Sequence, residues 1–217
     1  MRLHVVREAH VLLTIPVCGY FEVNCYLYAD DVSRHGFLID PGAEPQKLLA
    51  VIAAKKLVID HILLTHGHFD HMGAADILHR TLAAPIRMAE EGRLYVEDSE
   101  RNLSGPCGVP LTLADVAYFD AKTQPVFQAG ACRLQALPVP GHSPDSVCYI
   151  SLDEAIGFVG DTLYQDGIGL TTFPGGDPRA LWYSLNDVIF ALPKETMLYL
   201  GHGEPVRVGS LRAQLMS

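Results

Sequence analysis

Four side chains of types that bind metal ions lie within six consecutive residues of the chain. Residues 63–73 read LLTHGHFDHMG, so an apolar strand candidate leads directly into His66, His68, Asp70 and His71. Side chains two positions apart in an extended segment point to the same side, so His66 and His68 can both reach one ion. We expect Asp70 and His71 to fall where a helix begins and to face a second ion. The two pairs therefore suit two neighbouring cations better than one.

Four more short motifs each place one such residue at the end of a strand candidate. A Gly-His or Gly-Asp dipeptide means little alone, but four motifs in company with the HxHxDH array form a specific pattern. They are LIDPG with Asp40, VPGHSP with His142, FVGDTL with Asp161 and LGHG with His202. The remaining histidines stand outside such motifs and are interpreted as ordinary surface or core residues: His4, His10, His35, His61 and His79.

In this order, over residues 38–203, the five motifs resemble the signature of the metallo-β-lactamase superfamily. The resemblance implies an α/β fold, a four-layer αββα sandwich of the metallo-β-lactamase type, in a single domain over residues 1–217. Asp40 would then support the site by hydrogen bonding without being a ligand, with a simple turn-forming Asp-Pro-Gly as the alternative. The resemblance assigns one metal to His66, His68 and His142, a second to Asp70, His71 and His202, and a bridging position to Asp161.

These ligands offer nitrogen and oxygen donors without thiolate, which suits zinc and also iron or manganese. We therefore expect two divalent metal ions, with zinc as the first choice. Two cations about 3.5–4 Å apart can share a water and lower its pKa towards neutrality. The resulting bridging hydroxide would be the nucleophile, and Asp70 would orient it and accept its proton. This chemistry hydrolyses an activated acyl or phosphoryl compound.

Within the superfamily, the chain most resembles the glyoxalase II group, the hydroxyacylglutathione hydrolases. The resemblance lies in GDTLY at 160–164, GIG at 167–169 and FPGGD at 173–177. It implies a metal-dependent thioesterase whose partner is a small-molecule substrate. Leu170 stands where many relatives have Arg, and Asp145 stands where Gly is usual. The sequence ends soon after His202, so we expect no C-terminal helical domain that grips glutathione.

Other activities compatible with these motifs remain open. A persulfide dioxygenase would use one iron held by His66, His142 and Asp161. A lactonase would differ mainly in pocket residues. A non-catalytic metal-binding partner protein is a further alternative, although such proteins commonly lose ligands. A β-lactamase is disfavoured because Asp161 occupies the bridging position and the sequence shows no secretory signal.

Composition narrows the partners and the compartment. The chain has 217 residues, 49% hydrophobic and 19% charged, which is the composition of a globular protein. Its net charge is −9 and no basic run exceeds Lys55–Lys56, so we expect no nucleic acid and no membrane as partner. The five cysteines form no CxxC pair, and a cytoplasmic location fits best. The sequence leaves the oligomeric state open.

The elements that must position these residues alternate short apolar strands with a few helices. Helices are expected from Gln46 to Lys56, from His71 to Ala83 and from Pro178 to about Leu192, the last capped by Asp177. Residues 100–115 contain Gly and Pro without a strong period and are a candidate surface flap. Strands are expected at Val11–Val17, Asn24–Ala29, Gly36–Ile39, His61–Leu64, Val116–Phe119, Cys132–Val139, Val147–Leu152, Ile156–Val159 and Met197–Leu200.

Overall fold

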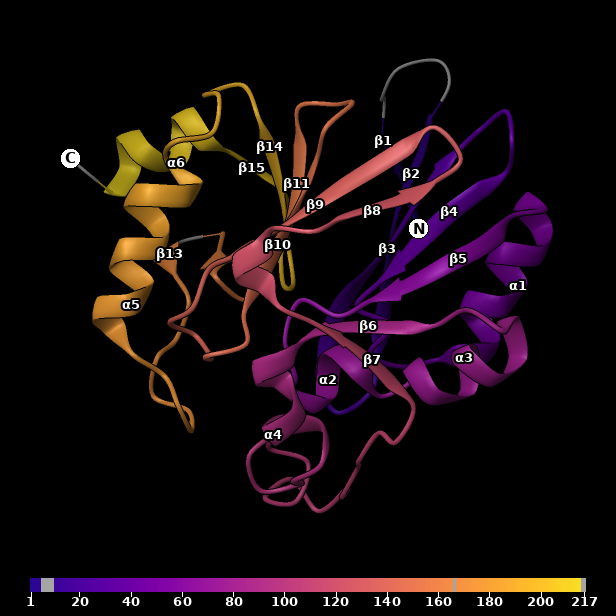
Figure 1. The fold of residues 1–217 in the computed structure, drawn as a ribbon, viewed down its shortest axis with the longest axis horizontal. Coiled ribbons are helices and arrows are strands. Elements are labelled where there is room, and N and C mark those ends of the chain that lie inside the picture. Colours follow the sequence, from indigo (N-terminus) through magenta and orange to yellow (C-terminus); the bar gives the residue numbers. More distant parts are fainter. Residues whose placement is uncertain (5–9, 166, 216–217) are drawn as a thin grey trace.

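Two β-sheets pack face to face, and helices cover the outer face of each sheet (Figure 1). The computed structural model describes residues 1–4, 10–165 and 167–215. In Figure 1 the indigo and magenta N-terminal part forms one sheet with its helices, and the orange and yellow C-terminal part forms the other. The expected four-layer αββα sandwich is therefore confirmed.

The first sheet contains seven strands in sequence order, β1 to β7. Strands β1 to β4 pair antiparallel, and β4 to β7 pair parallel. The parallel part needs crossover connections, which the helices supply. The strands are β1 (Arg2–His4), β2 (His10–Cys18), β3 (Glu22–Asp30), β4 (His35–Ile39), β5 (Val58–Leu63), β6 (Ile86–Ala89) and β7 (Val116–Phe119).

The second sheet has six strands in the order β15-β14-β11-β10-β9-β8, and a separate hairpin joins β12 to β13. Only β11 and β14 pair parallel in this sheet; the other neighbours pair antiparallel. The strands are β8 (Val126–Ala129), β9 (Cys132–Pro138), β10 (Val147–Ser151), β11 (Ile156–Gly160), β12 (Leu163–Tyr164), β13 (Gly167–Ile168), β14 (Met197–Leu200) and β15 (Val206–Arg207).

Short helices occupy the connections of both halves. Asp177 caps its helix as expected, since its carboxylate accepts from the backbone N–H groups of Arg179 and Ala180. Within the described residues, no helix has the length and apolar character of a membrane span. The helices are α1 (Pro45–Lys55), α2 (Phe69–Met72), α3 (Ala75–Leu82), α4 (Arg93–Val96), α5 (Pro178–Tyr183) and α6 (Val208–Leu215), with 3-10 turns at Glu90–Gly92 and Ala121–Thr123 and a π-helix at Ser184–Ile189.

Alternation along the strands of the first sheet fills two different cores. In β3, Cys25 and Leu27 pack towards the helices, whereas Tyr26 and Tyr28 pack between the two sheets. This is the period of two that a strand imposes on its side chains. A third apolar cluster lies between the second sheet and its helices and includes Leu181 of α5. The two sheets are therefore held by a shared core that combines aromatic and aliphatic side chains.

The helix expected from His71 to Ala83 is in fact two helices. It begins at Phe69, ends at Met72 and restarts at Ala75. The interruption has a tertiary cause, because the N–H of Ala74 donates to the carbonyl oxygen of Pro41 at 2.9 Å. This contact fixes the start of the helical segment to the turn that follows β4.

Candidate metal centre

All seven candidate ligands lie together at the carboxyl ends of the strands. The HxHxDH segment follows β5, His142 follows β9, Asp161 follows β11 and His202 follows β14; the supporting Asp40 follows β4. Three overlapping groups have ligand atoms that lie within 4.8 Å of one another. The groups are His66, His68 and His142, the first group; Asp70, His71 and His202, the second group; and His66, His71 and Asp161, which overlaps both.

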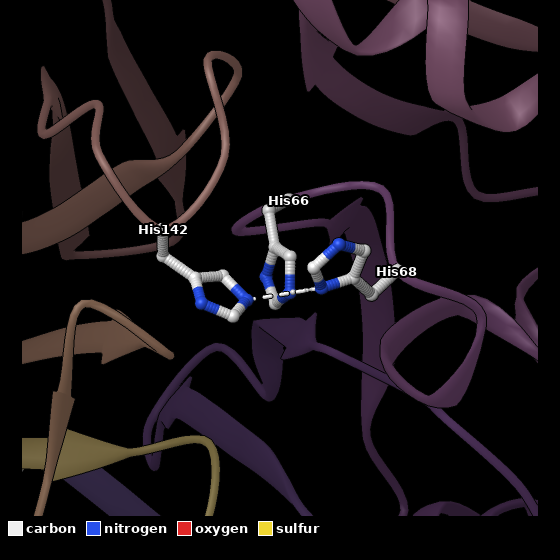
Figure 2. A group of neighbouring side chains, drawn as sticks. All are labelled: His66, His68 and His142. Carbon is white, nitrogen blue, oxygen red and sulfur yellow. Dashed lines mark hydrogen bonds between the residues drawn. The ribbon is translucent and has the colours of Figure 1, made fainter. Parts of the chain in front are cut away.

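The first group brings three imidazoles from two sheets to one point. His142 Nε2 lies 2.9 Å from His68 Nδ1, and His66 Nε2 lies 3.1 Å from the same atom. Figure 2 shows the three rings converging, with His142 and His68 entering from opposite sides. All three side chains are buried. Nitrogens this close without a proton or cation between them would repel through their lone pairs, so the arrangement suits a cation.

The second group surrounds the carboxylate of Asp161. His71 Nε2 lies 3.2 Å from Asp161 Oδ1, and His202 Nε2 lies 3.5 Å from Asp161 Oδ2. His142 of the first group is also near, with Nε2 at 3.8 Å from Asp161 Oδ2. Asp70 Oδ2 completes the group at 3.4 Å from His202 Nε2. Asp161 therefore stands between the two groups, at the position expected of a bridging residue.

Backbone carbonyls fix the outer nitrogen of two candidate ligands. His142 Nδ1 donates to the carbonyl oxygen of Leu170 at 2.7 Å, and His202 Nδ1 donates to that of Glu22 at 2.6 Å. With Nδ1 carrying the proton, Nε2 presents its lone pair to the centre. The side chain of Leu170 is exposed, so its backbone rather than its side chain positions His142.

Asp40 supports the centre from behind. Its Oδ2 accepts from His71 Nδ1 at 3.0 Å and from the hydroxyl of Thr65 at 2.7 Å. Its Oδ1 accepts from the backbone N–H of Thr65 at 2.8 Å. A turn-forming aspartate would not need these contacts, so the supporting interpretation fits the geometry better. The residue also holds a left-handed backbone conformation, with φ at 49°.

Two glycines permit the close approach of the strand ends. A Cβ at Gly201 would come within 2.2 Å of Asp161 Oδ1, and one at Gly160 within 2.3 Å of the Thr65 hydroxyl. Gly160 also has a positive φ of 51°, which side chains rarely adopt. The glycines of the Gly-Asp and Gly-His motifs are therefore needed for packing around the candidate ligands.

Burial and mutual repulsion keep the first group neutral. Burial lowers the pKa of His66 well below its usual value, and the neighbouring imidazoles lower it further. Burial, followed by the charge of His142, lowers the pKa of His68 to about 3. The pKa of His142 is also lowered, chiefly by burial. These imidazoles hold free lone pairs at neutral pH, as metal ligands must.

The second group is charged in the metal-free protein. Burial lowers the pKa of His71, but the carboxylates of Asp161 and Asp70 outweigh it and raise that pKa well above its usual value. His202 follows the same balance, and hydrogen bonding to Asp161 and Asp70 raises its pKa to about 9. Burial raises the pKa of Asp161, but His71 and His202 hold it well below its usual value. Protons on His71 and His202 thus occupy the place of a cation.

Metal binding near neutral pH should therefore release at least about two protons per chain, from His71 and His202. Calorimetry in buffers that differ in ionisation enthalpy measures this number. The number of protons released should fall as the pH rises through about 9, because His202 of the metal-free protein has a pKa of about 9 and has already lost its proton above that pH. The variant His202→Gln should release about one proton fewer. Binding without net proton release would contradict the charge state described above.

Buried polar atoms without a hydrogen-bond partner test whether the site fits metal ions. Such atoms cost free energy unless something satisfies them. Among the described residues they include His68 Nε2, His71 Nε2 and Asp161 Oδ1. His71 Nε2 and Asp161 Oδ1 face each other 3.2 Å apart inside the centre. Once His71 gives up its proton, both are donor atoms of the nitrogen and oxygen type that divalent transition metals bind. The residues present therefore fit metal ions.

A cavity of about 290 Å³ opens onto the centre, and its walls contain residues that the sequence motifs did not single out. Tyr164 donates its hydroxyl to Asp161 Oδ2 at 2.8 Å. Phe173 covers two imidazoles, with ring centroids 5.5 Å from His68 and 5.8 Å from His142. Both residues lie in the glyoxalase II-like segment. The sequence motifs identified this segment but predicted no role for these two side chains.

The loop expected as a flap is tied to the site by Asn102. This side chain is fully buried and donates to the carbonyl oxygens of Tyr95 and Leu111. The backbone carbonyl oxygen of Asn102 accepts from the N–H of Phe69, the first residue of α2, at 3.0 Å. The loop is therefore part of the wall beside the centre.

Asp145, the other departure from the family pattern, is buried near Gly67. Its Oδ2 lies 3.3 Å from where a Cβ at Gly67 would stand, between the first two histidines. Burial raises the pKa of its carboxyl to about 6. The closest neighbour of such a Cβ would be Tyr95 Cβ at 2.5 Å, so Gly67 leaves room chiefly for Tyr95.

Comparison with known proteins places the chain in a family. The model of the Metallo-beta-lactamase superfamily matches residues 18–202. The chain therefore belongs to the metallo-β-lactamase superfamily, most of whose members are hydrolases.

Individual relatives show which group of the superfamily the chain resembles. The hydroxyacylglutathione hydrolase GloC of Haemophilus influenzae is 32% identical over 197 residues, which cover 90% of this chain and 92% of that protein. This similarity confirms the glyoxalase II-like resemblance. The crystal structure of the BLEG-1 B3 metallo-beta-lactamase matches with a TM-score of 0.86 and 33% identity, over 94% of this chain and 96% of that one. TTHA1623, solved in a di-iron-bound form, matches with a TM-score of 0.80 and 33% identity, over 93% of this chain and 97% of that one.

Proposed function

We propose that this protein is a dinuclear-metal hydrolase that cleaves small thioesters. One observation carries the proposal: Asp161 lies between two groups of buried ligand atoms, within 3.2–3.8 Å of nitrogens from both. A site for one ion would not need six further ligands around a shared carboxylate. His66, His68 and His142 would hold one ion, and Asp70, His71 and His202 the other. The ions would be zinc, with iron and manganese as alternatives.

The chain's own residues would hold and move the reacting groups. Once bound, the two ions would supply an acidified water and would polarise the thioester carbonyl. Asp70 borders the cavity, and its pKa is low because His71 and His202 outweigh the effect of burial. Its ionised carboxylate can orient the water and accept its proton. Tyr164 keeps Asp161 in place, and Phe173 shields the imidazoles from solvent.

The net reaction adds water across the carbon–sulfur bond. The water oxygen bonds to the carbonyl carbon, the carbon–sulfur bond breaks, and the leaving thiolate takes up a proton. A thioester suits this centre because its leaving group departs readily without further acid catalysis. The similarity to GloC supports this substrate class over phosphodiesters. The cavity offers no basic stripe for nucleic acid, since no Lys or Arg is among its described lining residues.

All five cysteines are described and are free thiols. This supports a reducing compartment such as the cytoplasm as the place where the protein acts.

Purified protein is expected to bind up to two transition-metal ions per chain. Elemental analysis after loading with zinc, iron or manganese measures the number directly. A stoichiometry that stays at one iron, with oxygen consumed in the presence of glutathione persulfide, would favour the dioxygenase alternative. Protein that binds no metal under any of these conditions would rule out the mechanism.

A substrate panel separates the remaining activities. It consists of S-lactoylglutathione and simpler thioesters, lactones, a phosphodiester, a β-lactam and glutathione persulfide, each tested on the zinc, iron and manganese forms. We expect thioester turnover, with a KM for S-lactoylglutathione of about 1 mM or above, because no described cation lines the cavity. Turnover of lactones alone would keep the metal mechanism and reject the thioester. The similarity to a B3 β-lactamase makes the β-lactam a required member of the panel.

A further inference from the structure

An apolar hollow of about 470 Å³ lies beside the metal centre. It shares Phe21, Phe69 and Asp70 with the cavity that opens onto the centre, so the two spaces adjoin each other. Its volume falls in the range of pockets that bind small molecules. The mechanism proposed above uses only Asp70 among its lining residues.

Three aromatic side chains form one wall of the hollow. Tyr20 and Phe21 come from the turn between β2 and β3, and Phe69 is the first residue of α2. The ring centroids of Tyr20 and Phe21 lie 4.9 Å apart, and that of Phe69 lies 6.0 Å and 6.2 Å from theirs. Tyr20 is 58% exposed and Phe21 49%, although both are large and apolar. Exposed aromatic clusters of this kind mark binding surfaces.

The loop between α4 and β7 forms the opposite wall. It contributes Val109 and Leu111, and Val109 is 47% exposed. The loop is held in place by Asn102, whose side chain donates to the carbonyl oxygen of Leu111 at 2.9 Å. The hollow therefore has mainly apolar walls from the β2–β3 turn, α2 and the α4–β7 loop.

Charge decides which part of a thioester fits here. No Lys or Arg is among the described residues that line the hollow or the adjoining cavity, and the only charged group in the hollow is the carboxylate of Asp70. Glutathione carries carboxylates at both ends, and these would find no cation here and would lose hydration. A neutral chain or ring would gain from burial against the aromatic wall instead.

We infer that the hollow binds the acyl chain of the substrate, and that this chain is an aliphatic or aromatic group larger than lactoyl. The inference rests on the proposed thioesterase activity. A glutathione thiol part is excluded by charge, because its carboxylates would meet the carboxylate of Asp70 in the hollow and no Lys or Arg among the described lining residues. An aliphatic or aromatic acyl chain carries no charge. It therefore enters the hollow, while the thiol part lies towards the open cavity.

Two thioester series test the inference with the metal-loaded protein. One series varies the acyl group from acetyl through butanoyl and hexanoyl to benzoyl on one neutral thiol. The other keeps acetyl and lengthens the thiol. We expect kcat/KM to rise about fourfold for each methylene that enters the hollow in the acyl series, and to stay flat in the thiol series. A rise in the thiol series alone, or no rise in either, overturns the inference.

A matched pair of variants assigns the effect to the hollow. Val109→Asp places a carboxylate in the apolar wall, and Val126→Asp does the same on β8, away from the hollow, at a similar exposure of 49%. Val109→Asp should flatten the acyl-length dependence, whereas Val126→Asp should preserve it. Equal effects of the two variants would contradict the assignment.

Product binding separates failure of this inference from failure of the proposed function. Calorimetry should show that hexanoate binds the metal-loaded protein at least about tenfold more tightly than acetate, and that Val109→Asp removes this difference. If no thioester is hydrolysed but hexanoate is still preferred, the hollow stands and the thioesterase proposal fails. If thioesters are hydrolysed without preference for chain length and hexanoate binds no better than acetate, the thioesterase proposal stands and the acyl-chain inference fails.

Discussion

Replacing Asp161 with alanine is expected to remove both metal ions and to abolish turnover. Its two oxygens lie 3.2 Å from His71 and 3.5 Å from His202, and one also lies 3.8 Å from His142. Mutation of a residue that only hydrogen-bonds to a metal ligand typically lowers metal affinity by about 10- to 100-fold. Loss of a ligand shared by both sites should lower the affinity for each of the two metal ions by more than that. Elemental analysis of loaded protein, together with thioester hydrolysis, measures both effects.

The variant His79→Ala is the control for this experiment. His79 lies in α3, one to two helical turns beyond the HxHxDH motif, and its Nδ1 donates to the carbonyl oxygen of Ala84 at 2.8 Å. It should retain full metal content and activity, at a cost to stability of about 1 kcal/mol for one lost hydrogen bond. Similar behaviour of the two variants would show that the separation of ligands from other histidines is wrong. Loss of one ion only from Asp161→Ala would show that Asp161 does not bridge.

The position of the candidate site could be predicted because its residues follow strands. An apolar run that ends in His66 or in Asp161 places a polar group at a strand end, and strands of one sandwich end on a common edge. The order of motifs along the chain therefore indicated which residues meet. The sequence could not show distances, since the 3.2 Å between His71 and Asp161 depends on packing of the two sheets.

Local periodicity was least informative where a distant contact decides the structure. Residues 71–83 carry the pattern of one helix, but the contact between Ala74 and Pro41 divides it. Strand β6 was not predicted because Ile86–Ala89 includes Arg87 and has little β-branched or aromatic content, and its pairing with β5 and β7 supplies the stability that its own sequence lacks. The helix from Pro178 also ends as a π-helix at Ser184–Ile189, a change that no residue pattern indicated.

The walls around the centre were similarly hidden from the sequence. Tyr20 and Phe21 lie 45 or more positions before His66 in the chain, and no motif connects them to it. They reach the site because the turn between β2 and β3 ends beside α2, where both rings meet Phe69. Ligands could be found by type and spacing, whereas substrate contacts depend on which loops the fold brings to the same edge.

Replacing Asp40 with asparagine is expected to have the second-largest effect. The carboxylate accepts three hydrogen bonds, two from Thr65 and one from His71, and is almost fully buried. An amide keeps the shape but turns one acceptor into a donor, which leaves a buried N–H or O–H without a partner. We expect the free energy of unfolding of the metal-free protein to fall by about 3 kcal/mol, and affinity for the metal on His71 to fall about 10- to 100-fold.

Asparagine is the right replacement because Asp40 has a φ of 49°, which asparagine tolerates and alanine does not. The matched control is Asp60→Asn, because Asp60 also pairs with a histidine, His35, at 2.9 Å, but with both side chains partly exposed. That pair should contribute at most about 1 kcal/mol, and its loss should leave metal binding unchanged. Urea unfolding and competition with a chelator measure the two quantities. If Asp40→Asn and Asp60→Asn had the same effects on the free energy of unfolding and on metal affinity, Asp40 would only shape its turn. His71 would then need another partner to direct Nε2 towards the metal.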